Sequence, residues 1–221
     1  MKKIVITAFD PFGGEVINPA SVAVIALPDE IGDTKIIKQE LPTVYGKCFD
    51  ILLPILQAER PDAVICVGQA GGRAGISIER VAINLDDSKM TDNDGIVRTD
   101  QPIFADGTAA YFSTLPTNAI ICDLHQAEIP AFISNTAGTF VCNHIMYTTL
   151  HYVATNKLDM KVGFIHVPYL PAQTLDKPST PSMSLKNITK GLETIIRTTI
   201  DYRGGNKCER NNPQEKIHKK I

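Results

Sequence analysis

The chain has 221 residues, of which 43% are hydrophobic and 21% charged, and its formal net charge is -2. A chain of this size and balance predicts a soluble globular protein with a core of its own. The charge gives no reason to expect nucleic acid or an acidic membrane surface as a partner, and we expect neither.

The N-terminus and the cysteines bear on the compartment. Lys2 and Lys3 precede an apolar run that ends at Asp10 and Pro11, which is shorter than the roughly 7–15 residues of an export signal. The five cysteines are odd in number and widely spaced, unlike those of a small secreted disulfide framework. We therefore expect a cytoplasmic protein, in a reducing compartment where a reactive thiol persists.

Short apolar runs alternate with longer helical patterns along the chain. In chain order we expect strand Lys3–Ala8, helix Pro19–Leu27, strand Thr34–Gln39, helix Thr43–Arg60, strand Ala63–Val67, strand Ile76–Asn84, helix Thr117–Glu128, strand Ala131–Ser134, helix Phe140–Thr155, strand Lys161–His166 and helix Ser184–Tyr202. Asn18 before Pro19 suits a helix start, and Pro54 should kink the helix that contains it. The alternation predicts an α/β fold, with helices on both faces of a parallel or mixed sheet.

One domain is expected over residues 1–202, because no repeat or low-complexity linker interrupts them. Residues 203–221 differ, since Gly204 and Gly205 break the last helix and a polar sequence follows. We expect a disordered, solvated tail there. In sheets of this kind, functional residues collect on the loops at the carboxyl ends of the strands.

Cys142 lies just past the carboxyl end of a predicted strand, in the first turn of the next predicted helix. Unpaired backbone N–H groups and the positive end of the helix dipole meet at such a position. Both favour a thiolate and predict a thiol pKa below about 8.5. The same N–H groups could bind the oxyanion of a tetrahedral intermediate. A buried structural cysteine is the alternative interpretation.

His166 is the preferred base for this thiol. It ends a strand 24 residues after Cys142, and a strand–helix–strand crossover would bring the carboxyl ends of two parallel strands to one edge. An imidazole there could take the thiol proton and later protonate a leaving amine. His144 competes, but residues two apart on a helix do not face each other. A histidine that only closes the strand is the other alternative.

Glu79 is the candidate for orienting the imidazole. Strand alternation places it on the same face as Val81 and Ile83, and a buried carboxylate there needs a partner. A protonated histidine would serve, and so would Arg73 or Arg80. An edge-strand glutamate in solvent is the alternative.

Two glycine-rich segments follow strands. Residues 68–75 resemble a phosphate-binding loop, but they match neither the Walker pattern nor Gly-x-Gly-x-x-Gly, so a nucleotide site has weak support. Residues 9–15 carry two phenylalanines at a loop tip, Phe9 and Phe12. These rings could line an apolar pocket for a small flat ligand, or they could cap the core.

Taken together, these segments resemble the pyrrolidone-carboxylate peptidases, also called pyroglutamyl peptidase I. The matching segments are Phe9–Glu15 (FDPFGGE), Asn18-Pro19, Pro42-Thr43, Val67–Arg73 (VGQAGGR), Glu79–Asn84 (ERVAIN), Ser134–Asn143 (SNTAGTFVCN) and Gly163–Pro168 (GFIHVP). They follow the order of the family over about residues 2–200. Segments of this length in one order are highly specific.

The resemblance implies a single-domain α/β/α sandwich that hydrolyses N-terminal L-pyroglutamyl residues from peptides through a thioacyl-enzyme intermediate. It implies Cys142 as nucleophile, His166 as base and Glu79 as orienting acid, the residues also reached above. It further implies a cytosolic protein that needs no metal or cofactor and forms a homotetramer, with a homodimer as the alternative. The implied substrate pocket comprises Phe9, Phe12, Asn18, Thr43, Met90, Phe140, Val141 and Met146, with Gln69 nearby.

One position departs from the family pattern. Where the family usually has Ala-Arg-Ile-Pro-Asp-Asn, this chain has Ser88-Lys89-Met90-Thr91-Asp92-Asn93. Lys89 keeps the positive charge that the family's arginine places near the reacting centre, but it lacks the planar fork. The change bears on rate and substrate affinity and leaves the class of reaction unchanged.

Two other functions remain open at this point. A phosphorylase or nucleosidase would suit the α/β architecture and the glycine-rich loops, and it predicts phosphate-dependent activity that ignores thiol alkylation. A non-catalytic lactam- or peptide-binding protein predicts binding without product release. Neither function requires a thiol with a base.

Overall fold

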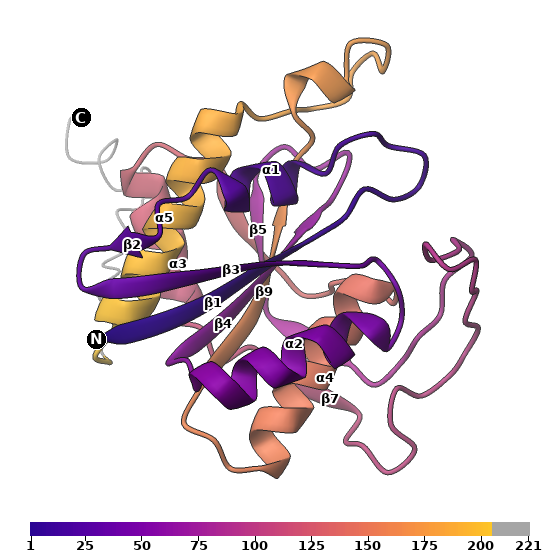
Figure 1. Ribbon diagram of the computed structural model, residues 1–221. Helices are drawn as coiled ribbons and strands as arrows, with labels where there is room; N and C mark the ends of the chain where they lie inside the picture. Colours follow the sequence, from indigo (N-terminus) through magenta and orange to yellow (C-terminus); the bar gives the residue numbers. More distant parts are fainter. Residues whose placement is uncertain (205–221) are drawn as a thin grey trace, which may run out of the picture.

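The computed structural model describes residues 1–204. Its centre is a seven-stranded sheet with the strand order β2-β3-β1-β4-β9-β5-β8 (Figure 1). Four neighbouring pairs are parallel, whereas β2–β3 and β5–β9 are antiparallel. A separate two-stranded antiparallel sheet is formed by β6 and β7.

The strands are β1 (Lys2–Phe9), β2 (Glu30–Ile31), β3 (Thr34–Leu41), β4 (Ala63–Gln69), β5 (Ile76–Glu79), β6 (Val81–Ile83), β7 (Ala110–Phe112), β8 (Ala131–Ser134) and β9 (Lys161–Val167). The helices are α1 (Pro19–Ile25), α2 (Lys47–Glu59), α3 (Thr117–Gln126), α4 (Val141–Thr155) and α5 (Leu185–Asp201), with a short 3-10 helix η1 (Pro171–Gln173).

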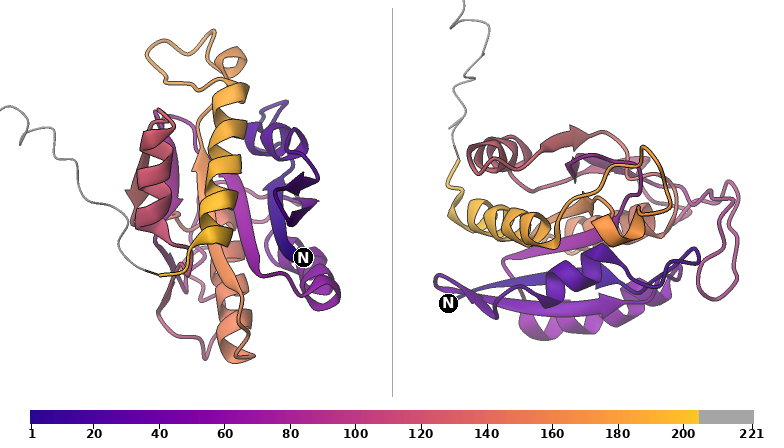
Figure 2. Two further views of the ribbon diagram at one scale, coloured as in Figure 1. Left: turned by 90° about the vertical axis from the view of Figure 1, so that its left-hand side faces the viewer. Right: turned by 90° about the horizontal axis from the view of Figure 1, so that it is seen from above.

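Two hydrophobic cores lie on opposite faces of the large sheet. One joins the sheet to α1, α3 and α5, and the other joins it to α2 and α4. The two views in Figure 2 show helices on both sides of the sheet. The predicted single-domain α/β/α sandwich around a mixed, mostly parallel sheet is thus confirmed.

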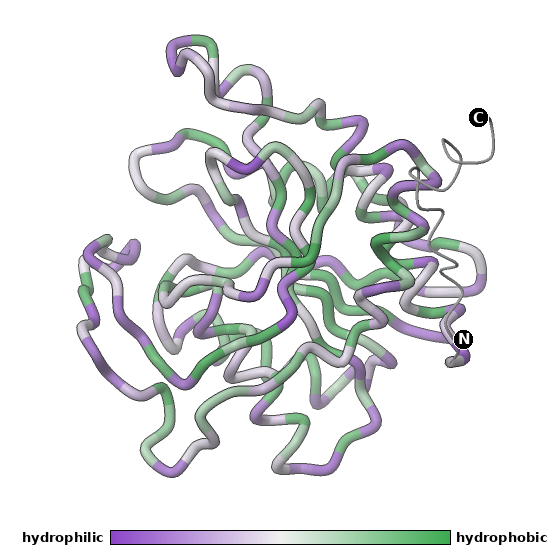
Figure 3. The backbone as a smooth tube through the Cα atoms, turned by 180° about the vertical axis from the view of Figure 1, so that it is seen from behind, coloured by the Kyte–Doolittle hydropathy of each residue, from purple (hydrophilic) through white to green (hydrophobic). Residues whose placement is uncertain are grey.

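The central strands have the composition of parallel strands that are covered on both faces. Every residue of β4 is buried, as are the last six of β1. Green, hydrophobic stretches of the backbone in Figure 3 gather in these central strands, while purple ones are more frequent in the outer loops. The carboxyl ends of β1, β4 and β9 therefore emerge together from a well-packed core.

Helix starts follow the capping chemistry of the sequence. The side chain of Asn18 accepts a hydrogen bond from the Ala20 N–H before α1, and Ser184 caps α5 in the same manner. Helix α2 begins at Lys47, four residues later than predicted, because Gly46 has a φ of 72°, which no residue in a right-handed helix adopts. The helix continues past Pro54.

The predicted strand Ile76–Asn84 is wrong as a single element. The chain leaves the large sheet after Glu79, and Arg80 donates its N–H to the Ser134 carbonyl before β6 begins. Glu79 is thereby the last residue of a strand buried on both sides. The short elements β2, β7 and η1 were not predicted.

The predicted parallel crossover from β8 through α4 to β9 is also wrong. β5 lies between these strands, parallel to β8 and antiparallel to β9, so β8 and β9 run in opposite directions. Helix α4 instead packs across β9 and β4. The carboxyl ends of β8 and β9 do not share an edge. The start of α4 instead reaches the end of β4 through the packing of α4 on the sheet.

The tail predicted over residues 203–221 lies, from residue 205 onward, outside the described residues. Within residues 1–204, no helix combines the length and the apolar composition needed to cross a membrane.

Candidate active site

Cys142 is the second residue of α4, and it is partly exposed. Its sulfur faces the end of β4, where Gly68 has no side chain. A Cβ added at Gly68 would lie 3.2 Å from Cys142 Sγ and 2.8 Å from the ring of Phe164. Such a Cβ would crowd both groups, so Gly68 leaves the space that the thiol occupies.

The first backbone N–H groups of α4 have no side-chain cap. The N-cap residue is Phe140, which makes no capping hydrogen bond. The first backbone bond of the helix runs from the His144 N–H to the Phe140 carbonyl. The N–H groups of the preceding turn, that of Cys142 among them, therefore remain available as donors beside the thiol.

His166 lies directly beside Gly68, because the two residues are partners in the parallel β4–β9 ladder. Its ring packs against Phe164, with the ring centroids 4.7 Å apart. Thiol and imidazole thus share one face of the sheet, at the carboxyl ends of β4 and β9. The hydrogen bonds of the described residues include none between Cys142 Sγ and the imidazole, so proton transfer requires these side chains to approach further.

Glu79 holds the imidazole from the neighbouring strand β5. His166 Nδ1 donates a hydrogen bond of 2.7 Å to Glu79 Oε1, and both residues are buried. Arg73 Nη1 donates to the same oxygen at 2.6 Å. Because Nδ1 is bound to a carboxylate, Nε2 is the nitrogen that remains to accept a proton.

Glu79 is held in its ionised form. Burial alone would raise the pKa of Glu79, but the hydrogen bond and charge of His166, with smaller contributions from Ser134 and Arg73, keep the pKa below its usual value. Oε2 of Glu79 is buried without a hydrogen-bond partner among the described residues. The carboxylate therefore makes all of its hydrogen bonds through Oε1.

Burial disfavours the charged forms of both the Cys142 thiol and the His166 imidazole. Burial raises the pKa of the Cys142 thiol to about 12, and the charge of Glu79 adds to this effect, whereas Arg73 opposes it. Burial also lowers the pKa of His166, despite the opposing effect of Glu79. The predicted lowering of the thiol pKa is thus wrong, because loss of water around the sulfur outweighs the donors at the helix end.

His144, the competing histidine, has both ring nitrogens engaged. Its Nδ1 bonds to Asp86 Oδ2 at 2.8 Å, and its Nε2 accepts the Gly46 N–H at 3.1 Å. The preference for His166 as the base agrees with this geometry, since no nitrogen of His144 is left to receive a thiol proton.

Aromatic rings gather near the start of α4. Phe12 and Phe140 have ring centroids 6.2 Å apart, and Tyr45 meets Phe140 edge-on at 5.5 Å. Phe9 is buried and lies 6.4 Å from Phe164, measured between ring centroids. The three predicted phenylalanines are thus in this region, and Tyr45 was missed because it lay within a predicted helix.

Asp10 anchors the polar residues of the predicted pocket. Thr43 donates both its N–H and its hydroxyl to Asp10 Oδ1, each at 2.7 Å. Asn93 Nδ2 donates to the same oxygen at 3.0 Å, and Asn18 Nδ2 donates to the Asp10 carbonyl at 3.2 Å. Asp10 and Asn93 were missed as candidates, although an acid directly before Pro11 at a strand end was a signal for Asp10.

The remaining predicted pocket residues lie in two environments. Val141 and Met146 are fully buried in the core between the sheet and α4. Lys89 and Met90 are exposed on the segment between β6 and β7. The Met90 sulfur lies 3.8 Å from the position that a Cβ on Gly13 would take, which places this segment beside the loop after β1.

Gln69 ends β4, one residue after Gly68. Because side chains alternate along a strand, its amide lies on the sheet face opposite to Cys142. Its backbone has an open edge. The β1–β4 ladder ends at the pair Thr7–Cys66, whereas β4 continues to Gln69, and Ala70 donates its N–H to β9. The backbone groups of Gln69 therefore point to the side that β1 leaves unpaired.

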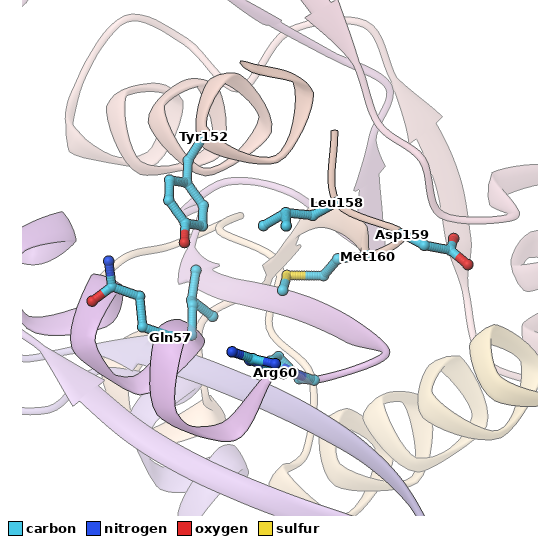
Figure 4. A pocket seen from close by; sticks show the side chains of 8 residues that line it. Gln57, Arg60, Tyr152, Leu158, Asp159 and Met160 are labelled. Carbon is cyan, nitrogen blue, oxygen red and sulfur yellow. The ribbon is translucent and has the colours of Figure 1, made fainter. Parts of the chain in front are cut away.

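A surface pocket of about 390 Å³ lies elsewhere (Figure 4). It is lined by Leu56, Gln57, Arg60, Pro61, Tyr152, Leu158, Asp159 and Met160. These residues include those just before β4 and β9, so the pocket is at the opposite end of the sheet from Cys142 and His166. Within residues 1–204, no group of three or more His, Cys, Asp or Glu side chains could hold a metal ion.

A thiol at a helix N-terminus, beside a histidine that a buried carboxylate orients, is the arrangement of a cysteine hydrolase. The model of the pyroglutamyl peptidase family matches residues 2–202 of this chain. The chain therefore belongs to the pyroglutamyl peptidase family of cysteine peptidases, as its sequence motifs predicted.

Known members of this family are similar to this chain over most of their lengths. The chain is 53% identical to a pyrrolidone-carboxylate peptidase of Alkaliphilus oremlandii, covering 90% of this chain and 93% of the relative. It is 51% identical to one of Streptococcus pyogenes, covering 91% and 94%. Pyroglutamyl peptidase I of Bacillus amyloliquefaciens superposes with a TM-score of 0.87 at 41% identity, covering 91% and 96%. A mutant pyrrolidone carboxyl peptidase of Pyrococcus furiosus gives 0.87 at 40%, covering 91% and 100%.

Proposed function

We propose that this protein removes the N-terminal pyroglutamyl residue from peptides, with Cys142 as nucleophile, His166 as base and Glu79 as the group that orients the imidazole. One observation carries the proposal: the buried 2.7 Å bond between Glu79 and His166 lies beside Gly68, where the missing side chain leaves room for the Cys142 sulfur.

In the acylation step, His166 Nε2 takes the proton of Cys142 Sγ as the sulfur attacks the carbonyl carbon that joins pyroglutamate to the next residue. The oxyanion accepts hydrogen bonds from free N–H groups in the first turn of α4. The C–N bond then breaks, and the leaving amine takes the proton from His166. The product is a thioester between pyroglutamate and Cys142.

In the deacylation step, water attacks the thioester while His166 Nε2 accepts its proton. The C–S bond breaks, the sulfur takes the proton back from His166, and free pyroglutamate leaves. Glu79 stays ionised throughout and stabilises the imidazolium that forms in each half of the reaction.

In this proposal the Cys142 thiol and the His166 imidazole are neutral before substrate binds, so His166 must remove the thiol proton during the reaction. Because the thiol pKa is raised and the His166 pKa is lowered, the thiolate forms only as the reaction proceeds. The open side of the thiol must therefore be closed by substrate, which brings sulfur and imidazole together and strengthens the hydrogen bonds of the site.

Pyroglutamate is a flat, uncharged lactam whose ring N–H and C=O need partners when buried. We assign the stacking surface to Phe12 and Phe140, supported by Tyr45. The unpaired backbone N–H and C=O of Gln69 suit the lactam C=O and N–H. Proline lacks the ring carbonyl and would leave the Gln69 N–H unsatisfied, which gives strong discrimination.

The other pocket residues act in different ways in this proposal. Phe9, Val141 and Met146 shape the apolar floor from the core. Asn18 and Thr43 hold the loop after β1 through Asp10. Lys89 and Met90 lie on the exposed segment beside that loop, where Lys89 would place positive charge near the reacting carbonyl.

The decisive assay measures release of a chromogenic amine from its L-pyroglutamyl derivative, with and without iodoacetamide. Cys142→Ala should lose essentially all turnover, by about a thousandfold or more, with an unchanged melting temperature. Cys48→Ala is the matched control, because Cys48 is a free but fully buried thiol, and it should keep its activity.

Activity that survives in Cys142→Ala would exclude the nucleophile. Turnover that depends on phosphate and ignores iodoacetamide would point to a phosphorylase or nucleosidase. Tight binding of pyroglutamate by calorimetry, with no amine released, would point to a binding protein.

We further propose that copies of the chain associate, as a homotetramer, in the cytoplasm. Val16 and Leu175 are each 87% exposed, on two loops joined by the ion pair of Glu15 with Lys177, and exposed apolar side chains favour association. Light scattering on the purified protein should give four times the chain mass, while a monomer would contradict the proposal. Activity in the cytosolic fraction of cells would test the location.

A further inference from the structure

Gln173 lies in η1, on the segment that leads from β9 toward α5, and its side chain is buried. Its amide connects three parts of the chain. Gln173 Nε2 donates to Gln69 Oε1 at 3.0 Å and to Glu15 Oε2 at 3.1 Å, with a longer contact of 3.4 Å to the Ile17 carbonyl. Gln173 Oε1 accepts the Leu170 N–H at 3.0 Å.

The direction of these hydrogen bonds is fixed by the partners. The Leu170 N–H can only donate and the Glu15 carboxylate can only accept. Gln173 must therefore turn its oxygen to Leu170 and its NH₂ group to Glu15 and Gln69. The amide cannot flip without losing bonds on both sides.

A second set of contacts holds the same segment in place. Lys177 Nζ pairs with Glu15 Oε1 at 2.6 Å and lies 4.6 Å from the centroid of the Tyr169 ring. The Tyr169 ring packs against Gly71, where an added Cβ would come within 2.4 Å of the ring. The segment from 169 to 177 thus fastens the loop after β1 to the loop after β4.

Gln173 reaches the candidate site from behind. The Gln69 side chain that it binds is on the sheet face opposite to Cys142, while the Gln69 backbone faces the edge that β1 leaves open. Glu15 and Ile17 belong to the loop that carries Phe12. The ring of Phe12 and the backbone of Gln69 are the groups assigned to the lactam. The buried amide of Gln173 therefore fixes the position of one relative to the other.

We propose that Gln173 is a positioning residue for the pyroglutamyl ring, which sets the distance between the backbone of Gln69 and the ring of Phe12 without touching the reacting atoms. The inference rests on the proposed function. It predicts that Gln173 controls recognition of the lactam and leaves the reactivity of Cys142 unchanged.

The test uses Gln173→Met, which keeps the length of the side chain but removes the hydrogen bonds. KM for the L-pyroglutamyl derivative should rise about tenfold, as expected for the loss of one or two buried hydrogen bonds, while kcat changes less than about twofold. The inhibition constant of free pyroglutamate should rise in parallel. The rate of inactivation by iodoacetamide should equal that of the wild type.

Lys177→Met is the matched control, because it removes the ion pair to Glu15 and leaves the Gln173 amide in place. We expect a smaller rise in KM from this variant. If Gln173→Met lowers the melting temperature but leaves KM and the inhibition constant unchanged, Gln173 is only structural and the inference is overturned. A tenfold fall in kcat of Gln173→Met with an unchanged KM would overturn the inference as well.

Gln173→Glu provides a second test that holds even if Gln173→Met fails to fold. Its carboxylate keeps an acceptor for Leu170 but faces Glu15 and the Gln69 oxygen, with Lys177 as the nearby cation. KM should be high at pH 8 and should approach the wild-type value near pH 5, where protonation restores one donor. A KM ratio to wild type that does not change with pH would contradict the inference. If the wild-type protein shows no turnover that iodoacetamide abolishes, the proposed function itself is refuted.

Discussion

Two histidines of this protein have nearly the same surroundings, yet only His166 is proposed to act in catalysis. His166 bonds through Nδ1 to Glu79 at 2.7 Å, and Arg73 binds the same carboxylate oxygen at 2.6 Å. His144 bonds through Nδ1 to Asp86 at 2.8 Å, and Arg98 binds that same oxygen at 2.7 Å. In each set the histidine and the acid are buried.

The difference lies at the other ring nitrogen. Nε2 of His144 accepts the backbone N–H of Gly46, and Arg98 stacks 4.7 Å from the centroid of the Tyr45 ring. This set ties α4 and the segment after β6 to the start of α2. Nε2 of His166 is the nitrogen left open toward the thiol. On the proposed mechanism, an acid–histidine–arginine set is not by itself a catalytic site, because the second ring nitrogen must also be free to accept a proton.

The largest contrast is expected from removing the two imidazoles. His166→Ala should lower kcat/KM by about a thousandfold, since it removes the general base and acid, with a stable fold. His144→Ala should lower the free energy of unfolding by about 1–3 kcal/mol, because Asp86 loses its buried partner, and should keep kcat within a few fold. Steady-state kinetics and denaturant unfolding of both variants measure this contrast. A thousandfold loss of kcat in a folded His144→Ala would break the comparison.

A smaller contrast is expected from neutralising the two acids. Glu79→Gln should lower kcat by about a hundredfold or more, because an amide does not stabilise the imidazolium and permits the wrong tautomer. Asp86→Asn should change kcat by less than about threefold and lower the melting temperature. Thermal unfolding with kinetics on both variants separates the roles. Equal losses of kcat in the two variants would show that both sets serve the reaction.

The smallest contrast concerns pH and the two arginines. The pKa of His166 is lowered, mainly by burial and in part by Arg73, so the base is neutral at pH 7. Activity should therefore fall only as pH drops below about 6.5. Arg73→Gln removes a nearby cation and should move this acid limb of kcat/KM to higher pH. Arg98→Gln should leave it in place, and a limb that moves equally in both variants would rule out a specific effect of Arg73.

Two of the candidate groups were predictable from sequence because a strand end and a helix start mark them: Cys142 follows a predicted strand and opens a helix, and His166 ends a predicted strand. Glu79 lay inside the predicted strand Ile76–Asn84 and was found instead as a carboxylate on an apolar face, whereas its place at the end of β5 appears only in the structure. Strand direction was not predictable in this way. All four residues of β5 are buried, and so short a buried run carries no periodicity that gives its direction or its neighbours. The position of β5 between β8 and β9 was therefore not predictable from the sequence.

Other differences arise from tertiary contacts. The N-terminal part of the predicted helix Thr43–Arg60 is not helical, because Asp10 binds Thr43 and Asp92 accepts the Tyr45 N–H. The raised pKa of the Cys142 thiol likewise depends on tertiary structure. The residues that bury the sulfur, and Glu79, are far from Cys142 in the chain. Local rules described the helix end correctly but not the protein that surrounds it.

The last two residues of β4 have a consequence for anyone who would redesign this protein. Gly68 faces the thiol, whereas the side chain of Gln69 lies on the opposite face of the sheet. Substitutions at these two adjacent positions therefore act on two separate faces of the sheet. Changes that press on the sulfur belong at the first position. On the proposed role of Gln69, changes meant to adjust which ring is accepted belong at the second position and at its buried partner Gln173, away from the reacting groups.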